Sequence, residues 1–319
     1  MLLVAVGCGP ERARDDRVRV GLITPGSIAD AAWNAGAYQG LQWIHDSLGL
    51  HTSHVEARTP GAQEEALRTY ANQGYDLVFG HGFEFQDPAE RVAQDYPETV
   101  FLVTSGVRVA GNVAPLIFRL HEGTYLAGMV AGGLTRTGVI GFVGGIELPP
   151  IVLGYQGWVN GAATVRRDVD SRISYLNNFD DATAGHEAAL ALIRLGADML
   201  HHNADAAGLG VFQAAKENPG VFIFGANADQ SALAPTRVIG SAVIDLPRAF
   251  LLVAREVAAG TFVPEVQSFG LASGVISYRP NPAADRALPP GLGEWMDAVR
   301  DSITTGTLSP LTSPKGDSP

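Results

Sequence analysis

The chain has 319 residues, 46% hydrophobic and 17% charged, which is the ordinary balance of a globular α/β protein of about two domains. Its formal net charge of −11 argues against a nucleic-acid partner, because phosphate backbones are bound by basic surfaces. No window approaches the roughly 18 apolar residues of a membrane-spanning helix, and the single cysteine excludes an internal disulfide framework.

The N-terminal run MLLVAVGC ends at Cys8, after which GPERARDD is polar. Small residues before a lone cysteine resemble a bacterial lipobox, in which the cysteine is lipidated and becomes the mature N-terminus. The segment ahead of Cys8 is too short for a complete secretory signal, and Ala5 stands where a lipobox most often has Leu. We predict that residues 1–16 are a linker and the remnant of a lipoprotein signal whose front end is missing, with Cys8 lipidated. An ordinary thiol is the alternative.

The first predicted βα unit follows directly. The apolar run VRVGLI, residues 18–23, predicts a strand, TPGS a turn, and the next residues a helix. The connecting loop carries Asp30, Trp33 and Asn34. In open α/β sheets ligands bind outside the carboxyl ends of the strands, so these side chains are candidate ligand contacts. The alternative makes Asp30 the helix N-cap and Trp33 a core anchor.

Strands and helices then alternate in two series, which predicts two lobes with parallel sheets, because parallel strands need crossover helices. The first series has predicted strands near residues 53–57, 76–79, 100–104 and 113–118, with helices near 62–73 and 89–94. The second starts with a helix near 122–134 and has strands near 139–143, 172–176, 198–202 and 221–224, with helices near 184–195 and 210–217.

Seven ordered blocks resemble the basic membrane protein (BMP) family of substrate-binding lipoproteins, which serve ABC importers and typically bind purine nucleosides. The blocks are DAAWNAGAYQGL from Asp30, YDLVFGHGFEF from Tyr75, HEGTYLAGMVAG from His121, GFVGG from Gly141, NNFDD from Asn177, GADMLHHNADAAGLGVFQAAKE from Gly196 and FGANADQSA from Phe224. The resemblance covers about residues 18–278. Seven blocks in the same order and with suitable spacing identify the family far more specifically than any one block does.

The resemblance implies the type I periplasmic binding protein fold, in which two Rossmann-like lobes with parallel sheets are joined by a three-crossover hinge and close on the ligand. We expect lobe one at residues 17–116 plus 240–260, and lobe two at 117–239 plus 261–281. Residues 282–319 form a C-terminal extension. It contains an amphipathic stretch at 293–303, and the following TTGTLSPLTSPKGDSP is typical of disorder.

The resemblance also implies a ligand site, in which Trp33 and Phe179 stack on the two faces of the ligand. Asp30, Asn34 and Asp180 flank these rings as polar contacts. The remaining implied site residues are His81, Gly82 and Phe83 at the mouth of the cleft, Ser105 at the end of the fourth strand, Asn203 and Gly208 in a loop of lobe two, and Asn227 and Asp229 in a polar block.

Three positions depart from the family pattern. Asn227 and Ser105 stand where the family has aspartates, and Ile244 stands where it has a lysine. In the nucleoside binders these positions help to bind the sugar. We therefore expect a weakened ribose contact beside an intact aromatic slot.

Other candidate sites have simpler interpretations. Trp158 is expected to pack in the core, although a third ring over the pocket is the alternative. His201 and His202 are adjacent on a strand and point to opposite faces, so they are poorly placed to chelate one metal ion. The pair Asp180 and Asp181 precedes a helix and fits an N-cap better than an acid/base pair.

The predicted function is that of an extracytoplasmic substrate-binding protein of an ABC importer, monomeric, anchored to a membrane by lipid, and delivering a purine nucleoside or base to the permease subunits. No cofactor, metal or catalytic residue is predicted. The alternatives are a sensory protein for another heterocycle such as a vitamin, and a nucleoside-processing enzyme. The sequence lacks the motifs G-x-G-x-x-G after the first strand, G-x-S-x-G and H-E-x-x-H, which argues against an enzyme.

Overall fold

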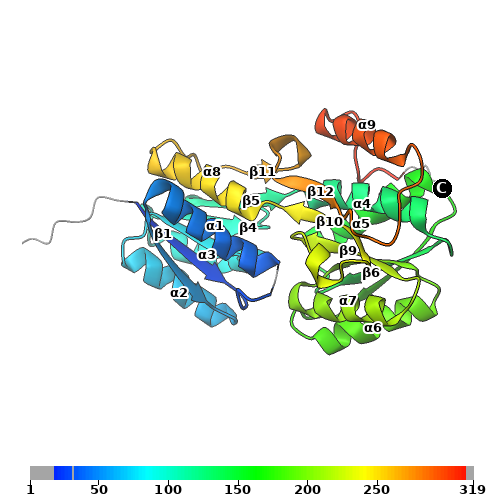
Figure 1. Ribbon diagram of the computed structural model, residues 1–319. Helices are drawn as coiled ribbons and strands as arrows, with labels where there is room; N and C mark the ends of the chain where they lie inside the picture. The colour runs from blue at the N-terminus through cyan, green and yellow to red at the C-terminus, as the bar shows by residue number, and fades with distance from the viewer. Residues whose placement is uncertain (1–17, 31, 314–319) are drawn as a thin grey trace, which may run out of the picture.

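The computed structural model describes residues 18–30 and 32–313, which form two α/β lobes side by side (Figure 1). Each lobe contains one six-stranded sheet with helices on both faces. Within these residues, no helix is both long and apolar enough to cross a membrane. Cys8, the predicted lipidation site, lies outside the described residues, so its lipidation stays a prediction.

Lobe one has a fully parallel sheet in the order β11-β5-β4-β3-β1-β2. Helices α1 and α8 cover one face of the sheet, and α2 and α3 cover the other. The elements are β1 (Arg19–Thr24), α1 (Trp33–Leu48), β2 (His51–Glu56), α2 (Pro60–Asn72), β3 (Leu77–His81), α3 (Gln86–Ala93), β4 (Val100–Thr104), β5 (Val113–Phe118), α8 (Leu246–Ala258) and β11 (Gln267–Phe269).

Lobe two repeats this plan in the order β12-β10-β9-β8-β6-β7, with only the edge strand β12 antiparallel. Helices α4, α5 and α9 pack on one face, and α6 and α7 on the other. The elements are α4 (Leu120–Leu134), β6 (Val139–Gly144), α5 (Pro149–Val165), β7 (Asp170–Tyr175), α6 (Ala182–Arg194), β8 (Met199–Asn203), α7 (Gly208–Glu217), β9 (Phe222–Asn227), β10 (Val238–Ile244), β12 (Ile276–Pro280) and α9 (Leu292–Thr304).

The chain crosses between the lobes three times, from β5 to α4, from β10 to α8, and from β11 to β12. This confirms the predicted type I periplasmic binding protein fold. Three predicted lobe boundaries are wrong. Residues 117–118 complete β5 of lobe one, residues 240–244 belong to β10 of lobe two, and β11, predicted for lobe two, pairs with β5 in lobe one. An apolar run shows that a strand forms but not which sheet it joins.

Helices α4 and α5 approach each other at backbone distance. A methyl group at Gly161 would lie 1.9 Å from the carbonyl oxygen of Tyr125, and one at Gly128 would lie 2.1 Å from that of Trp158. Glycine is therefore required at both positions, since no side chain fits between the helices. Trp158 is fully buried in this core, which confirms the packing role predicted for it.

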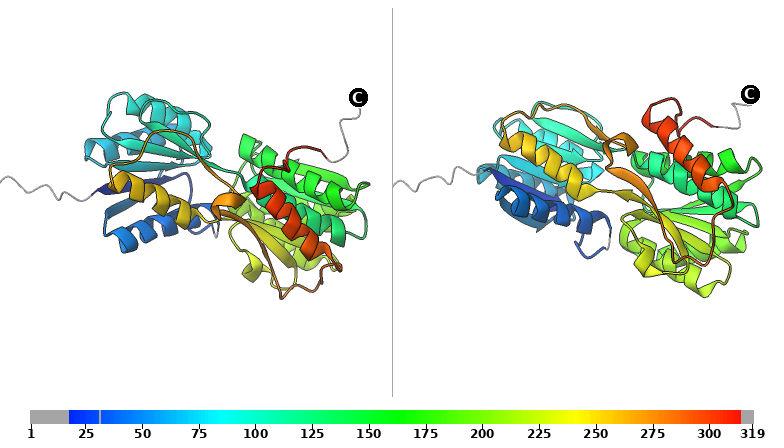
Figure 2. Two further views of the ribbon diagram at one scale, coloured as in Figure 1. Left: turned by 90° about the horizontal axis from the view of Figure 1, so that it is seen from above. Right: turned by 45° about the horizontal axis from the view of Figure 1, so that its top comes forward.

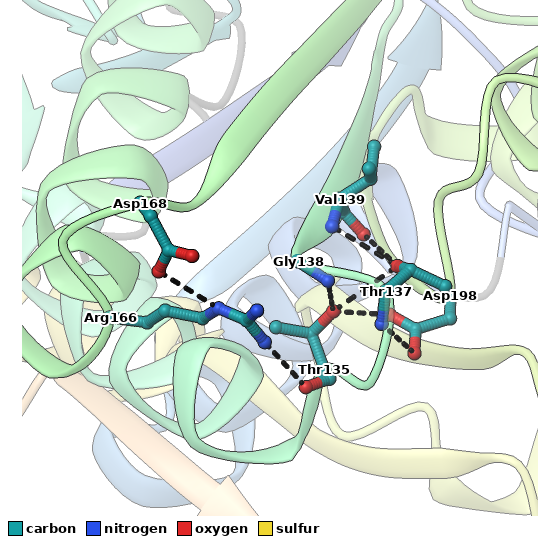
Figure 3. A network of polar contacts seen from close by, with 7 residues as sticks. All are labelled: Thr135, Thr137, Gly138, Val139, Arg166, Asp168 and Asp198. Carbon is teal, nitrogen blue, oxygen red and sulfur yellow. Dashed lines mark hydrogen bonds and ion pairs between the residues drawn. The ribbon is translucent and has the colours of Figure 1, made fainter.

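A polar network fixes the turn between α4 and β6 (Figure 3). This turn lies at the amino end of β6, whereas the cleft described below lies at the carboxyl ends of the strands. The buried carboxylate of Asp198 accepts hydrogen bonds from the Thr135 hydroxyl at 2.6 Å and from the Arg136 backbone N–H at 2.7 Å. The Arg166 guanidinium donates to the Thr135 carbonyl and pairs with Asp168. These hydrogen bonds pair the polar backbone groups of Thr135 and Arg136 at the turn, and we assign the network a structural role.

The predicted amphipathic stretch near the C-terminus is helix α9, which lies along α4 (Figure 2). Its buried residues are Leu292, Met296, Val299 and Ile303. The prediction of disorder after this helix is wrong for residues 305–313. Leu308 packs against the core of lobe two, and the Pro310 carbonyl accepts a hydrogen bond from Asn160. Residues 314–319 lie outside the described residues.

Candidate ligand-binding cleft

A cavity of about 430 Å³ lies between the lobes, at the carboxyl ends of the parallel strands. This is the usual place and size for a small-molecule site in an α/β protein. The lining comprises Pro25, Gly26, Ser27, Ala29, Asp30, Trp33, Asn34, Arg58, Gly82, Phe83, Glu84, Ser105 and Phe118 from lobe one, Ile146, Leu148, Pro150, Ile151, Asn177, Asn178, Phe179, Asp180, Asn203, Asp205, Ala206 and Asn227 from lobe two, and Leu120 and Ile244 beside the crossovers.

Backbone strain is concentrated in this lining. The non-glycine residues with positive φ in the described part of the chain are Ser105, Asn177, Asp205 and Asn227, with φ between 46° and 65°. All four line the cavity, and each stands at or just beyond the carboxyl end of a strand. Left-handed backbone costs energy for residues with a side chain, and such residues cluster at functional sites.

The indole of Trp33 forms one aromatic wall, and its orientation is fixed from behind. It stacks on the His81 imidazole with ring centroids 4.1 Å apart, and Phe118 meets it edge-on at 6.1 Å. His81 Nε2–H donates to the Trp33 carbonyl at 3.1 Å, so Nδ1 accepts from the Thr104 hydroxyl at 3.0 Å. Burial lowers the pKa of His81 to about 3, which keeps the ring neutral. His81 is fully buried and lies behind the lining rather than in it.

Phe179 forms the second aromatic wall, from lobe two. Its ring lies against the backbone of Gly145, where an added methyl group would come within 2.2 Å of the ring. The Phe179 carbonyl accepts a hydrogen bond from the Ala207 N–H at 2.8 Å. The Asn178 side chain accepts from the backbone N–H groups of Asp180 and Asp181. The loop that carries the ring is therefore held on both sides.

Asp30 lines the cavity and also binds the first turn of α1, although the N-cap position itself is Ala32 and not Asp30 as the alternative had it. Its carboxylate accepts from the backbone N–H groups of Ala32, Asn34 and Ala35, at 2.6 to 3.1 Å. It also accepts from Asn34 Nδ2 at 2.9 Å. Because a carboxylate only accepts, this bond fixes the Asn34 amide, whose buried Oδ1 has no partner among the described residues. Asn34 Oδ1 is thus an unused hydrogen-bond acceptor in a residue that lines the cavity.

Carboxylates from both lobes face the cavity. The pKa of Asp205 is raised well above its usual range, first by burial and then by the negative charges of Asp30, Glu84 and Asp180. Asn227 Nδ2 donates to Asp205 at 3.4 Å. The surrounding cleft partly desolvates the Glu84 carboxylate and raises its pKa, although the residue keeps contact with solvent. Arg58 lies 4.0 Å from Asp180 of the other lobe and pairs with Glu56.

Most of the predicted site residues meet at this cavity. The predicted residues in its lining are Asp30, Trp33, Asn34, Gly82, Phe83, Ser105, Phe179, Asp180, Asn203 and Asn227. Ile244 also lines it and is almost fully buried, so an apolar side chain occupies the position where the family pattern has lysine.

Three predicted residues lie outside the lining. His81 supports Trp33 from behind. Gly208 begins α7, and a methyl group there would lie 2.2 Å from the His202 ring. The Asp229 carboxylate accepts from the backbone and hydroxyl of Ser231. None of the three residues reaches the cavity, and each contacts residues of its own lobe.

The prediction missed Arg58, Glu84, Asn178 and Asp205. Glu84 and Asp205 follow the ends of β3 and β8 within quoted sequence blocks, so their position after a strand was an available signal. Arg58 follows β2, in which no residue is buried, so no apolar strand pattern marks it.

The histidine pair on β8 serves the core. His201 Nδ1 lies 3.0 Å from the Phe224 carbonyl, and His202 Nε2 lies 2.9 Å from Gln230 Oε1. No group of three metal-ligating side chains occurs within the described ranges. Asp181 accepts from the Ala184 N–H as the N-cap of α6, as predicted.

Comparison with known proteins agrees with this architecture. Basic membrane protein A1 of Borrelia garinii subsp. bavariensis is 28% identical over 309 residues, which cover 94% of this chain and 90% of that protein. A purine-binding protein of Brucella abortus is 25% identical over 303 residues, covering 94% and 85%. A solute-binding protein of an ABC transporter system from Aeropyrum pernix has the same fold, with a TM-score of 0.83, 22% identity and 94% coverage of each chain.

The family described as ABC transporter substrate-binding protein PnrA-like matches residues 17–303. The match includes both lobes, the three crossovers and every residue of the cavity lining. A substrate-binding protein of this kind takes a small-molecule ligand and works with the permease of an ABC transporter. The chain belongs to this family, the Bmp family of PnrA-like ABC transporter substrate-binding proteins.

Proposed function

We propose that this protein captures a purine-like heterocycle outside the cytoplasm and delivers it to an ABC permease. The observation that carries the proposal is the pair of aromatic walls, Trp33 from lobe one and Phe179 from lobe two, in one cavity. A flat ring held between two aromatic faces gains about 1–3 kcal/mol from each stack, whatever its edge groups. A relative of similar length is named as a purine-binding protein, which supports this class of ligand.

The proposal is tested by removing one wall. Replacing Trp33 with Ala removes one stack, and we expect the ligand to bind roughly tenfold more weakly. The matched control is Trp43→Ala, on the same helix, where the indole is 42% exposed and lies outside the cavity lining. Calorimetric titration of both variants with the tightest purine ligand gives the comparison. Unchanged affinity in the Trp33 variant would show that the pocket assignment is wrong.

The sugar end of the cavity favours a base over a nucleoside. Ile244 offers no charge, and Asn227 and Ser105 replace carboxylates of the family pattern. A charge-assisted hydrogen bond to a ribose hydroxyl is worth about 1.5–3 kcal/mol, or roughly 10- to 150-fold in affinity. Its loss removes much of the advantage that a nucleoside has over the free base.

Titration with adenine, adenosine, guanine and guanosine measures this advantage directly. A charge-assisted ribose contact is worth at least about tenfold in affinity. Because this cavity lacks it, we expect each free base to bind within about tenfold of its nucleoside. Nucleosides that bind more than a hundredfold tighter than their bases would contradict this proposal. The absence of heat with all four compounds would move the ligand to another chemical class.

A further inference from the structure

The charge of the cavity lining is strongly one-sided. Among the described residues that form it, four are carboxylates and one is basic. The carboxylates are Asp30 and Glu84 of lobe one and Asp180 and Asp205 of lobe two. The basic residue, Arg58, is paired with Glu56 and lies 4.0 Å from Asp180, so its charge is already shared between two carboxylates.

The carboxylates differ in how well the protein itself satisfies them. Asp30 accepts three backbone N–H groups and one amide, so helix α1 holds its charge. Asp205 receives a longer hydrogen bond, 3.4 Å from Asn227 Nδ2, and stands in the field of three other carboxylates. Glu84 is partly desolvated by the cleft walls. Ionisation of Asp205 and Glu84 is therefore costly in the empty cleft, and a positive charge beside them would lower that cost.

Two further features of the lining point the same way. Asn34 lines the cavity, and its buried Oδ1 has no partner within the described residues, so the protein leaves this hydrogen-bond acceptor unused. Trp33 and Phe179 line the cavity with aromatic rings, whose negative quadrupoles attract a cation most strongly where water is excluded. At the position where the family pattern has a lysine, Ile244 adds no opposing charge.

We propose that this cleft takes its heterocycle in a positively charged form, stacked between Trp33 and Phe179 with its N–H groups and its charge directed at Glu84 and Asp205. The inference rests on the proposed function, because it assigns the charge of the ligand that the aromatic walls hold. A cation relieves the repulsion between carboxylates of the two lobes, so it holds the lobes together across the cleft. A neutral ring leaves that repulsion in place.

The test compares ligands that differ mainly in charge. One pair is 1-methyladenosine, a cation at neutral pH, and its neutral isomer N6-methyladenosine. The other pair is 1-methylnicotinamide, a permanent cation, and neutral nicotinamide, which lack a sugar. Calorimetric titration at neutral pH and low salt gives the four affinities. We expect the cation to bind at least tenfold more tightly in each pair that binds, a difference of about 1.4 kcal/mol.

The variants Glu84→Gln and Asp205→Asn assign the preference to these carboxylates. Each keeps the size of its side chain, and Asn tolerates the positive φ of position 205. We expect each to reduce the cation preference at least threefold. The control Glu98→Gln changes an exposed carboxylate of lobe one outside the lining and leaves the preference unchanged.

The outcomes separate the two proposals. Neutral compounds that bind as tightly as their cationic partners would overturn the charge inference and leave the proposed function in place. Binding of 1-methylnicotinamide without any purine would support the charge inference and overturn the purine assignment. If folded protein binds none of the four compounds and no purine, both proposals fail.

Discussion

Asp205 illustrates, at the scale of the residue, the energetic cost of building this cleft. It has a left-handed backbone, at φ 46°, and a carboxylate in the field of Asp30, Glu84 and Asp180. Nothing in the packing of lobe two requires a charge at this point, since the neighbouring Ala204 and Ala207 are buried and apolar. Such a position is kept where function needs it, and replacing it commonly stabilises the fold.

We therefore predict that Asp205→Asn stabilises the ligand-free protein at neutral pH. The folded state raises the pKa of Asp205 above the unfolded value of about 3.9, so the charged form destabilises the fold. This cost is absent below about pH 4, grows as the pH rises toward the folded pKa, and is complete above it. Denaturant unfolding of both proteins at pH 7 and at pH 4 measures it. A gain that is the same at both pH values would contradict the electrostatic cause.

The elements show how far the sequence alone predicts the fold. The central strands β4 and β5 coincide with their predicted residues, 100–104 and 113–118, because strands buried on both faces appear as continuous apolar runs. The edge strands β2 and β7 begin about two residues before the predicted positions, since their side chains are only partly buried. The exchange of β10 and β11 between lobes depends on sheet pairing, which leaves no local signal.

The contact between α4 and α5 gives a prediction with a control on the same helix. Gly161→Ala places a methyl group 1.9 Å from the Tyr125 carbonyl oxygen, so the helices must separate. We expect a loss of about 1–3 kcal/mol in the free energy of unfolding. At Gly154 an added methyl group meets nothing within 4 Å, so Gly154→Ala should stabilise α5 by about 0.5–1 kcal/mol. Thermal unfolding compares the two variants, and we expect Gly161→Ala to melt at a lower temperature than Gly154→Ala. Similar melting temperatures would refute the packing argument.

At the scale of the whole molecule, the two walls of the site come from residues far apart in the sequence. The family resemblance predicted that Trp33 and Phe179 would share a site, and both line the cavity. It did not predict that His81 stands behind Trp33, or that the carboxylates of Glu84 and Asp205 share the cleft. The place of His81 behind Trp33 depends on tertiary packing, which no local pattern encodes. For Glu84 and Asp205 the local signal was their position just after a strand, and only the assembled lobes show that they share one cleft.

The crossovers are tied together where the lobes meet. The buried carboxylate of Glu122 accepts from the Leu271 N–H at 2.6 Å and pairs with Arg119 at 2.8 Å, which joins the first crossover to the third. The Asp245 N–H donates to the Val275 carbonyl at 2.7 Å and joins the second crossover to the third. We expect a bend at these few residues to move one lobe as a rigid body against the other, as in hinge closure.

We predict that the ligand closes this hinge on a single protein molecule. A ligand that touches both aromatic walls gains its full binding energy only when the lobes approach, so binding shifts the population toward the compact form. Small-angle X-ray scattering should show a smaller radius of gyration at saturating ligand, with monomer mass before and after. The control is Trp33→Ala at the same ligand concentration, where we expect a smaller decrease in the radius of gyration. When more ligand saturates this variant, the decrease should equal that of the unaltered protein. A radius of gyration that stays constant at saturation of the unaltered protein would show that capture occurs without closure.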